Sequence, residues 1–369
     1  MKTANTERLS KQQILTELQS FGLNLTDTLG APGRKGGAGP SDHKAVTLDG
    51  TTVMVPIYTN TAARSPYSVT IEPDTNRGML FCEDQALTPI HFPQTPQFYN
   101  LTTADGIPYW KIALLHSRDV LATTVLQTCK RYRNPATVCQ FCAIEKSLEA
   151  DRTIARKSPE HLSEVAETAV RLDGVKHFVM TTGTPHTSDR GAAYLAECAR
   201  AVKARVDLPI QAQCEPPDDF AWFQRLKDAG VDSLGMHLEA ITPEVRAKIM
   251  PGKAEVPLEY YFQAFEAAVQ IFGWGQVSTY LLVGLGDSLE ALVAGCDRLI
   301  QLGVYPFVVP FVPITGTPLE NHAAPKSEFM YKVYEQVGGL LQQARMSSTN
   351  MKAGCAKCGA CSAIANFET

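Results

Sequence analysis

The feature that most constrains the fold is an alternation of short apolar runs with amphipathic helical runs between about Lys111 and Arg345. Apolar runs such as "KHFVMTTGT" and "GQVSTYLLVGLG" are each followed by a stretch with helical periodicity. Roughly six such units are present, and each is long enough for the crossover that joins two parallel strands. Units of this kind fold as an open doubly wound sheet or as a barrel.

Polar or glycine-rich residues follow the apolar runs of this alternation. In both architectures the carboxyl ends of the parallel strands meet at one edge, where ligands bind. We therefore expect a ligand site at that edge, built from Thr181 to Thr184, Glu215, His237, Glu239, Gly284 to Asp287 and Thr315 to Thr317.

The segments on either side of the array lack this alternation of strands and helices. Residues 1 to about 30 indicate a helix with a turn at Gly22, and residues 44 to about 99 hold short β-prone runs broken by Gly, Asn and Pro. We predict a helix plus a small β-rich domain over residues 1–110, the strand–helix array over residues 111–345, and a cysteine-rich tail over residues 346–369.

The composition excludes several classes of function. A net charge of -4 provides no basis for binding nucleic acid or an anionic membrane surface. The first residues are polar and lack the apolar core of a secretory signal, and the longest apolar runs are too short to span a bilayer. We therefore expect a cytoplasmic protein with no membrane or nucleic-acid partner.

The ten cysteines of the chain are unevenly distributed, because two short segments hold more than half of them. These two groups are Cys129, Cys139 and Cys142, and Cys355, Cys358 and Cys361. A reducing compartment disfavours disulfides, so grouped thiols indicate metal binding. Three thiolates are one ligand short of a closed zinc site, although His116 could supply the fourth, so zinc and iron–sulfur both remain open.

The first cysteine group resembles the cluster loop of the radical S-adenosylmethionine (SAM) superfamily. In that family three cysteines follow the first strand of the array, and an aromatic residue, here Phe141, precedes the third. The resemblance implies an α/β fold, a partial (β/α)6 barrel of the TIM type, and a [4Fe–4S] cluster held by Cys129, Cys139 and Cys142. The spacing Cys-x9-Cys-x2-Cys is six residues longer than the usual Cys-x3-Cys-x2-Cys, but a longer loop costs little extra closure entropy.

Later strand ends resemble the SAM-binding segments of the same family. The "TTGTP" segment is similar to the stretch that contacts the SAM amino group, and Glu239 in "MHLEA" to the residue that reaches the ribose. Arg246 would suit the SAM carboxylate, and "LLVGLGDSLE" is similar to the stretch that packs on the adenine. With Glu215 added, the implied SAM-binding residues are Thr181, Thr182, Gly183, Glu215, Glu239, Arg246, Gly284 and Gly286.

The segment "PFVPITGTPLEN" resembles the sixth strand of biotin-synthase-like enzymes, so the likeness extends from about Leu126 to Asn321. Within the superfamily the chain is therefore similar to the branch of biotin synthase and lipoyl synthase. The resemblance is closest to the radical SAM proteins of nitrilase-linked gene clusters.

The tail motif Cys355-x2-Cys358-x2-Cys361 has the spacing with which bacterial ferredoxins hold three corners of a [4Fe–4S] cluster. We expect a second iron–sulfur cluster here. Its fourth ligand would be Cys82 or Ser362, or the fourth iron would be open. In the family such a cluster conducts electrons, anchors substrate or donates sulfur.

The resemblance thus implies an enzyme whose 5′-deoxyadenosyl radical abstracts hydrogen from a small-molecule substrate, with sulfur insertion as an extension. It also implies an electron donor such as ferredoxin or flavodoxin. The alternatives are a SAM-dependent group transfer without radicals and a zinc-stabilised binding or regulatory protein.

Overall fold

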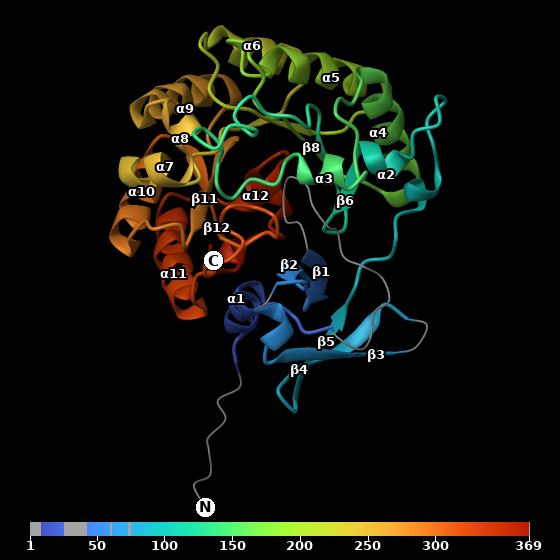
Figure 1. Ribbon diagram of the computed structural model, residues 1–369, viewed down its shortest axis with the longest axis vertical. Coiled ribbons are helices and arrows are strands. Elements are labelled where there is room, and N and C mark those ends of the chain that lie inside the picture. Colours follow the sequence, from blue (N-terminus) through green and yellow to red (C-terminus); the bar gives the residue numbers. More distant parts are fainter. Residues whose placement is uncertain (1–8, 26–42, 60, 73–74, 369) are drawn as a thin grey trace, which may run out of the picture.

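The computed structural model describes residues 9–25, 43–59, 61–72 and 75–368. It contains two separate sheets, and Figure 1 shows the N-terminal sheet (blue) lying below the larger curled sheet and its helices. The larger sheet carries the strand–helix array that the sequence predicts.

The N-terminal part consists of one helix and a five-stranded antiparallel sheet with the order β2-β1-β5-β4-β3. Helix α1 begins in a capping box between Ser10 and Gln13 and ends at Gly22, whose φ of 79° suits a residue without a side chain. The elements are α1 (Lys11–Phe21), β1 (His43–Leu48), β2 (Thr51–Pro56), β3 (Tyr67–Ile71), β4 (Arg77–Cys82) and β5 (Gln85–His91).

The larger sheet has seven strands in the order β12-β11-β10-β9-β8-β7-β6. Strands β7 to β12 are parallel, and β6 is an antiparallel edge strand beside β7. The bounds are β6 (Leu114–His116), β7 (Val120–Thr124), β8 (His177–Thr181), β9 (Ile210–Gln213), β10 (Ser233–Gly235), β11 (Val277–Val283) and β12 (Val304–Pro310). The predicted partial barrel of six parallel strands is confirmed, and β6 is an addition to it.

Helices cover the outer face of this curled sheet (Figure 1). Their ends follow the sequence signals: Ser158 caps α4 through His161 N, and Gly174 closes the helix with a φ of 65°. The helices are α2 (Tyr109–Ile112), α3 (Lys146–Glu149), α4 (Pro159–Asp173), α5 (Ala192–Arg205), α6 (Ala221–Asp228), α7 (Pro243–Ile249), α8 (Pro251–Ala254), α9 (Leu258–Phe272), α10 (Leu289–Gln301), α11 (Ser327–Gln343) and α12 (Cys355–Cys358). None of the helices in the described ranges combines the length and apolarity that crossing a membrane requires.

The cysteine-rich tail is held between the barrel and the N-terminal part. The carbonyl of Ala360 accepts hydrogen bonds from Met54 N at 2.7 Å and from Gln19 Nε2 at 3.4 Å. Near the chain end, Glu368 accepts hydrogen bonds from the Ser348 amide and hydroxyl, both at 3.0 Å. Helix α1 and strand β2 thus meet the tail beside the barrel and help to fix the tail against it.

Candidate functional site

A cavity of about 680 Å³ inside the barrel brings both cysteine groups together. Its walls include all the cysteines of the loop after β7 and all those of the tail. The same cavity is lined by residues of β8, β11 and β12 and by parts of β1 and β2 in the N-terminal sheet. The two thiol groups therefore line one cavity, although most of the chain separates them in sequence.

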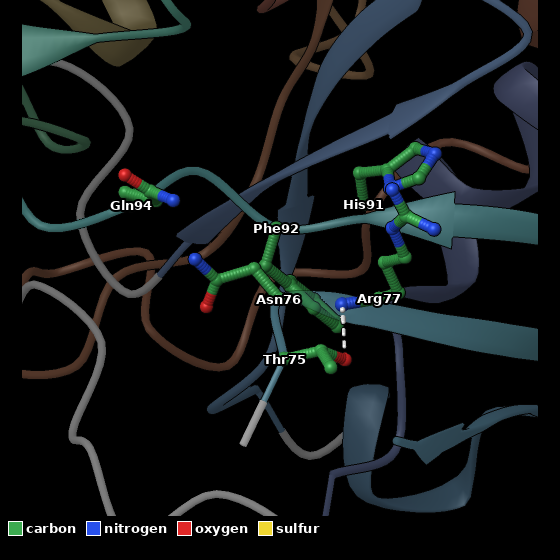
Figure 2. Close-up of a pocket in the computed structure, with 6 residues that line it drawn as sticks. All are labelled: Thr75, Asn76, Arg77, His91, Phe92 and Gln94. Atoms are coloured by element: carbon green, nitrogen blue, oxygen red, sulfur yellow. Dashed lines mark hydrogen bonds between the residues drawn. The ribbon is translucent and has the colours of Figure 1, made fainter. Parts of the chain in front are cut away.

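A second pocket lies on the N-terminal sheet, as Figure 2 shows, and is lined by Thr75, Asn76, Arg77, His91, Phe92 and Gln94. It contains none of the residues that the sequence singles out, and it touches the barrel cavity only through the shared lining residue Gln94. The cysteines of both groups and the carboxylates of Glu215 and Glu239 line the barrel cavity, so the candidate site is there.

The first cysteine group lies on a loop held by several backbone hydrogen bonds. The amide of Lys130 donates to the carbonyl of Thr184 at 2.9 Å, which ties the loop to the end of β8. The amide of Cys142 donates to the carbonyl of Cys139 at 2.9 Å and forms a tight turn around Phe141. Cys139 and Cys142 thus flank one tight turn, and both line the cavity.

The long segment between Cys129 and Cys139, and Gln140 after it, contact helices α7 and α8. Gln140 donates its amide to the carbonyl of Ile249 at 2.8 Å and its side-chain nitrogen to the carbonyl of Lys248 at 2.7 Å. Gly252 approaches so closely that an added Cβ would lie 2.5 Å from the carbonyl oxygen of Thr137. The residues between the first two cysteines are therefore held by packing and hydrogen bonds to α7 and α8.

Burial favours the protonated thiol form of Cys139 and Cys142. It raises the pKa of Cys139 to about 12, although the nearby Lys253 acts in the opposite direction. Burial and the neighbouring Cys139 also raise the pKa of Cys142. A thiol must lose its proton to ligate a metal. Metal binding by these cysteines would therefore release protons.

Two buried ion pairs lie beside the thiols. Arg131 pairs with Glu215, whose Oε1 also accepts a hydrogen bond from the Thr184 hydroxyl at 2.8 Å. Lys253 pairs with Glu239 at 3.2 Å. Burial would raise the pKa of Glu215, but Arg131 and Lys253 outweigh it and hold that pKa below its usual value.

One member of these pairs has an uncommon backbone conformation. Glu239 has a φ of 66°, in the left-handed region that residues with a Cβ rarely adopt. Such a conformation costs on the order of 1–3 kcal/mol and persists only where surrounding contacts enforce it. Here the Glu239 amide donates to the Tyr280 carbonyl, and the Glu239 carbonyl accepts from the Leu282 amide, so β11 holds the carboxylate at the cavity wall.

Most of the SAM-binding residues that the sequence suggests line the cavity. They are Thr181, Thr182, Gly183, Glu215 and Glu239. Gly183 is placed where any side chain would collide, because an added Cβ would lie 2.1 Å from the carbonyl oxygen of Thr128. The strand end and the cysteine loop therefore pack backbone against backbone at this point.

The remaining three suggested residues, Arg246, Gly284 and Gly286, are not among those that line the cavity. Arg246 is only 2% exposed and donates through Nη1 to the carbonyl of Leu238 at 2.7 Å, with its guanidinium over the ring of Tyr261. Gly284 packs against Pro325, and Gly286 faces Val245. The guanidinium of Arg246 is thus already engaged by the chain's own carbonyl group and aromatic ring.

Gly183→Ala tests the close contact between the strand end and the cysteine loop. Because the added methyl would overlap the Thr128 carbonyl, we expect the loop to move and the anaerobically reconstituted protein to bind at least about 30% less iron. Iron is measured against protein concentration. Gly339→Ala is the control, since no atom lies within 4 Å of the added methyl, and its iron content should equal that of the parent.

Sequence reasoning missed several polar residues of the cavity, namely Arg131, Gln213, Lys253 and Tyr280. A signal for one of them exists in the strand "IQAQ", where Gln211 and Gln213 alternate with apolar residues. In a strand buried on both faces, polar side chains at every second position indicate that one face meets a polar partner. Arg131 and Lys253 carried no such signal, because each lies in an irregular or short helical segment.

The tail thiols enter the barrel at the end opposite to the cysteine loop. Gly354 donates its amide to His177 Nδ1 at 3.3 Å, at the first residue of β8, and Cys355 donates its amide to Gln211 Oε1 at 3.2 Å. An added Cβ on Gly354 would lie 2.3 Å from the Gln211 amide group, so the tail makes a close approach here. Only glycine fits at position 354, and such a close backbone approach lets the tail wrap tightly around a bound group.

The two side chains suggested as a fourth tail ligand lie elsewhere or are already bonded. Cys82 is at the end of β4, beside Tyr67 and Glu17, and does not line the cavity. Ser362 donates its hydroxyl to the carbonyl of Val308. Neither is presented to the cavity, so the tail presents three thiols to it.

Each group supplies three thiols, one fewer than the four ligands of a closed structural zinc site. A structural zinc ion needs four ligands that converge to about 2.0–2.3 Å from a single atom. Within the described part of the chain, no three His, Cys, Asp or Glu side chains converge in that way. A cubane iron–sulfur cluster with one open corner takes three thiolates, each bound to a different iron atom.

Comparison with known proteins agrees with this geometry. Residues 127–299 match the Radical SAM superfamily. Bacteriochlorophyllide c C-7(1)-hydroxylase from Chlorobaculum limnaeum is 34% identical over 136 residues, which is 36% of this chain and 34% of that protein. Lipoyl synthase from Halorhodospira halophila is 28% identical over 170 residues, or 45% of this chain and 48% of that protein.

The chain thus spans about a third to a half of the length of these curated relatives. Among solved structures, methylornithine synthase is 19% identical with a TM-score of 0.47, over 61% of this chain and 62% of that one. The superfamily implies a [4Fe–4S] cluster and SAM, and its members need a reductant. Residues 127–299 are a radical SAM domain.

Proposed function

We propose that the protein cleaves SAM reductively and uses the resulting radical to abstract hydrogen from a small-molecule substrate. When bound, a [4Fe–4S] cluster supplies the electron for this cleavage, which yields methionine and a 5′-deoxyadenosyl radical. Cys129, Cys139 and Cys142 would hold the cluster. The observation that carries the proposal is that these three thiols line one cavity with Thr181, Glu215 and Glu239 at the carboxyl ends of the barrel strands.

The chain's own residues would orient SAM through charge and hydrogen bonds. Glu239 would accept from the ribose hydroxyls, and Thr182 and Gly183 would border the amino group. Lys253 lines the same wall and carries a positive charge, because the carboxylate of Glu239 offsets the effect of burial on its pKa. Lys253 is thus better placed than the enclosed Arg246 to meet the carboxylate of SAM.

The barrel would exclude water from the radical. Between the two thiol groups the cavity wall includes the apolar side chains of Val179, Leu282 and Val309. A wall that excludes solvent and holds the substrate against the radical limits side reactions of the radical. The electron would come from an external donor, for which we propose a ferredoxin or a flavodoxin.

Anaerobic reconstitution followed by a SAM-cleavage assay tests this function. We expect a brown protein that absorbs broadly near 400 nm and forms 5′-deoxyadenosine when dithionite and SAM are added, since the chromophore and the electron both belong to the cluster. A colourless, zinc-loaded protein that forms no 5′-deoxyadenosine would contradict the proposal.

The tail thiols Cys355, Cys358 and Cys361 would hold a second iron–sulfur cluster. Replacing all three by alanine is expected to lower the iron content by about half, because the two sites would hold clusters of equal size. Unchanged iron would contradict a second cluster. Cys198→Ala is the matched control, since this thiol is buried in α5 away from the cavity, and its iron content should stay at the parent level.

Sulfur insertion is a second candidate function, favoured by the single cavity that both thiol groups share. A cluster used only to conduct electrons need not face the substrate space, whereas one that anchors substrate or donates sulfur must. A screen of small metabolites for faster 5′-deoxyadenosine formation would find the substrate. Loss of acid-labile sulfide during the same incubation would indicate sulfur transfer, and constant sulfide would exclude it.

A further inference from the structure

A network of buried polar side chains lies under the tail at the closed end of the barrel. Gln211 is completely buried, and Gln213 and Ser278 are nearly so. Polar groups in a barrel interior cost free energy unless they are hydrogen-bonded, and apolar residues would fill a plain barrel core more favourably. Their presence therefore needs a partner inside the barrel.

The tail supplies that partner. Gln211 accepts from Gln213 Nε2 at 2.7 Å and from the Cys355 amide at 3.2 Å, while its own Nε2 donates to the Ser278 hydroxyl at 3.0 Å. All polar atoms of the Gln211 side chain are thus used, and its orientation is fixed. The fixed oxygen of Gln211 in turn orients the amide nitrogen of Gln213.

Two donors of this network converge on one sulfur. Gln213 Nε2 donates to Cys355 Sγ at 3.1 Å, and the phenol of Tyr280, on strand β11, lies close to the same sulfur and lines the same cavity. Tyr280 is held in turn by edge-on contacts with His237 at 4.8 Å and Phe307 at 5.0 Å between ring centroids. Both donors therefore have fixed directions, and both belong to the barrel rather than to the tail.

Resting on the second cluster of the proposed function, we propose that Gln213 and Tyr280 are positioning residues that tune the tail cluster by donating hydrogen bonds to the Cys355 sulfur. A hydrogen bond to a cysteine sulfur withdraws negative charge from the iron–sulfur centre, which favours the reduced form. The reduction potential of the tail cluster is therefore less negative than it would be with apolar residues at these two positions.

The test isolates the tail cluster in the full-length protein. The variant in which Cys129, Cys139 and Cys142 are replaced by alanine keeps only the tail site, and its midpoint potential is measured by an anaerobic redox titration followed by electron paramagnetic resonance. In this background Tyr280→Phe and Gln213→Leu are each expected to move the midpoint to a more negative potential, with iron content unchanged. Combining the two is expected to move it further.

Tyr305→Phe is the matched control, because Tyr305 is also a buried tyrosine of the barrel but bonds to Glu368. Its midpoint should equal that of the background. If Gln213→Leu does not fold, the midpoint potential of Tyr280→Phe alone tests the tuning role. This substitution removes a single oxygen atom and so disturbs the packing least. Iron lost from both variants would make these residues part of cluster binding and overturn the tuning role.

Failure of the inference differs from failure of the proposed function. An iron-free background variant would overturn the second cluster, and the tuning role with it. A background variant that holds iron, but whose midpoint is the same with and without the two donors, would overturn the tuning role alone.

Discussion

Replacing Cys129, Cys139 and Cys142 together by alanine is expected to abolish SAM cleavage while the tail keeps its iron. The rate of 5′-deoxyadenosine formation should fall by at least about a thousandfold. Removing the group that supplies the electron removes the acceleration as a whole, and enzymatic accelerations begin at about a millionfold. The rate is measured anaerobically with dithionite as reductant, and remaining iron is measured in the same sample.

Two controls separate this loss from general damage. Cys198→Ala removes a buried thiol that does not line the cavity, so its cleavage rate should match that of the parent. Circular dichroism of the triple variant should keep the helical signal, because the loop cysteines lie outside the helices of the barrel. A triple variant that still formed 5′-deoxyadenosine would show that the electron enters SAM from another site.

Arg131→Met is expected to lower the free energy of unfolding by about 3–5 kcal/mol. Arg131 and Glu215 are 5% and 10% exposed, so removing the guanidinium leaves a carboxylate without its charge partner in a buried wall. The loss is much larger than for a surface pair, since the remaining charge cannot be solvated. Urea denaturation followed by circular dichroism measures it.

The partner substitution and a surface pair complete this test. Adding Glu215→Gln to Arg131→Met removes the unpaired charge, so the double variant should recover most of the lost stability. Arg298→Met breaks the exposed pair with Glu259, whose side chains are 48% and 65% exposed, and should cost less than about 1 kcal/mol. Equal losses for Arg131→Met and Arg298→Met would contradict a buried, stabilising role for the Arg131 pair.

The order of elements along the barrel could be predicted from local patterns. Helix α4 is an example, because Ser158 and Pro159 mark its start and Gly174 marks its end. Strand β12 is a continuous apolar run, as is typical of a parallel strand buried on both faces. The edge strand β6 was not expected, since three residues carry too little periodicity to separate a strand from a loop.

The roles of individual charges could not be predicted in this way. Arg246 has a suitable residue type for a carboxylate, but its guanidinium bonds to the Leu238 carbonyl beneath the cavity wall. Lys253 has no motif around it, yet its ammonium reaches Glu239 at the wall. A side chain several bonds long can point to either side of its helix, and only the packing around it selects the direction.

The sequence by itself determined the strand–helix array, the position of the strand ends and the two groups of cysteines, because each depends on residues close together in the chain. The tertiary structure alone decided that both groups face one cavity and that Gln213 and Tyr280 meet the sulfur of Cys355. Contacts of this kind join residues from distant segments, so they follow from the curvature of the sheet and the docking of the tail, which no local pattern encodes.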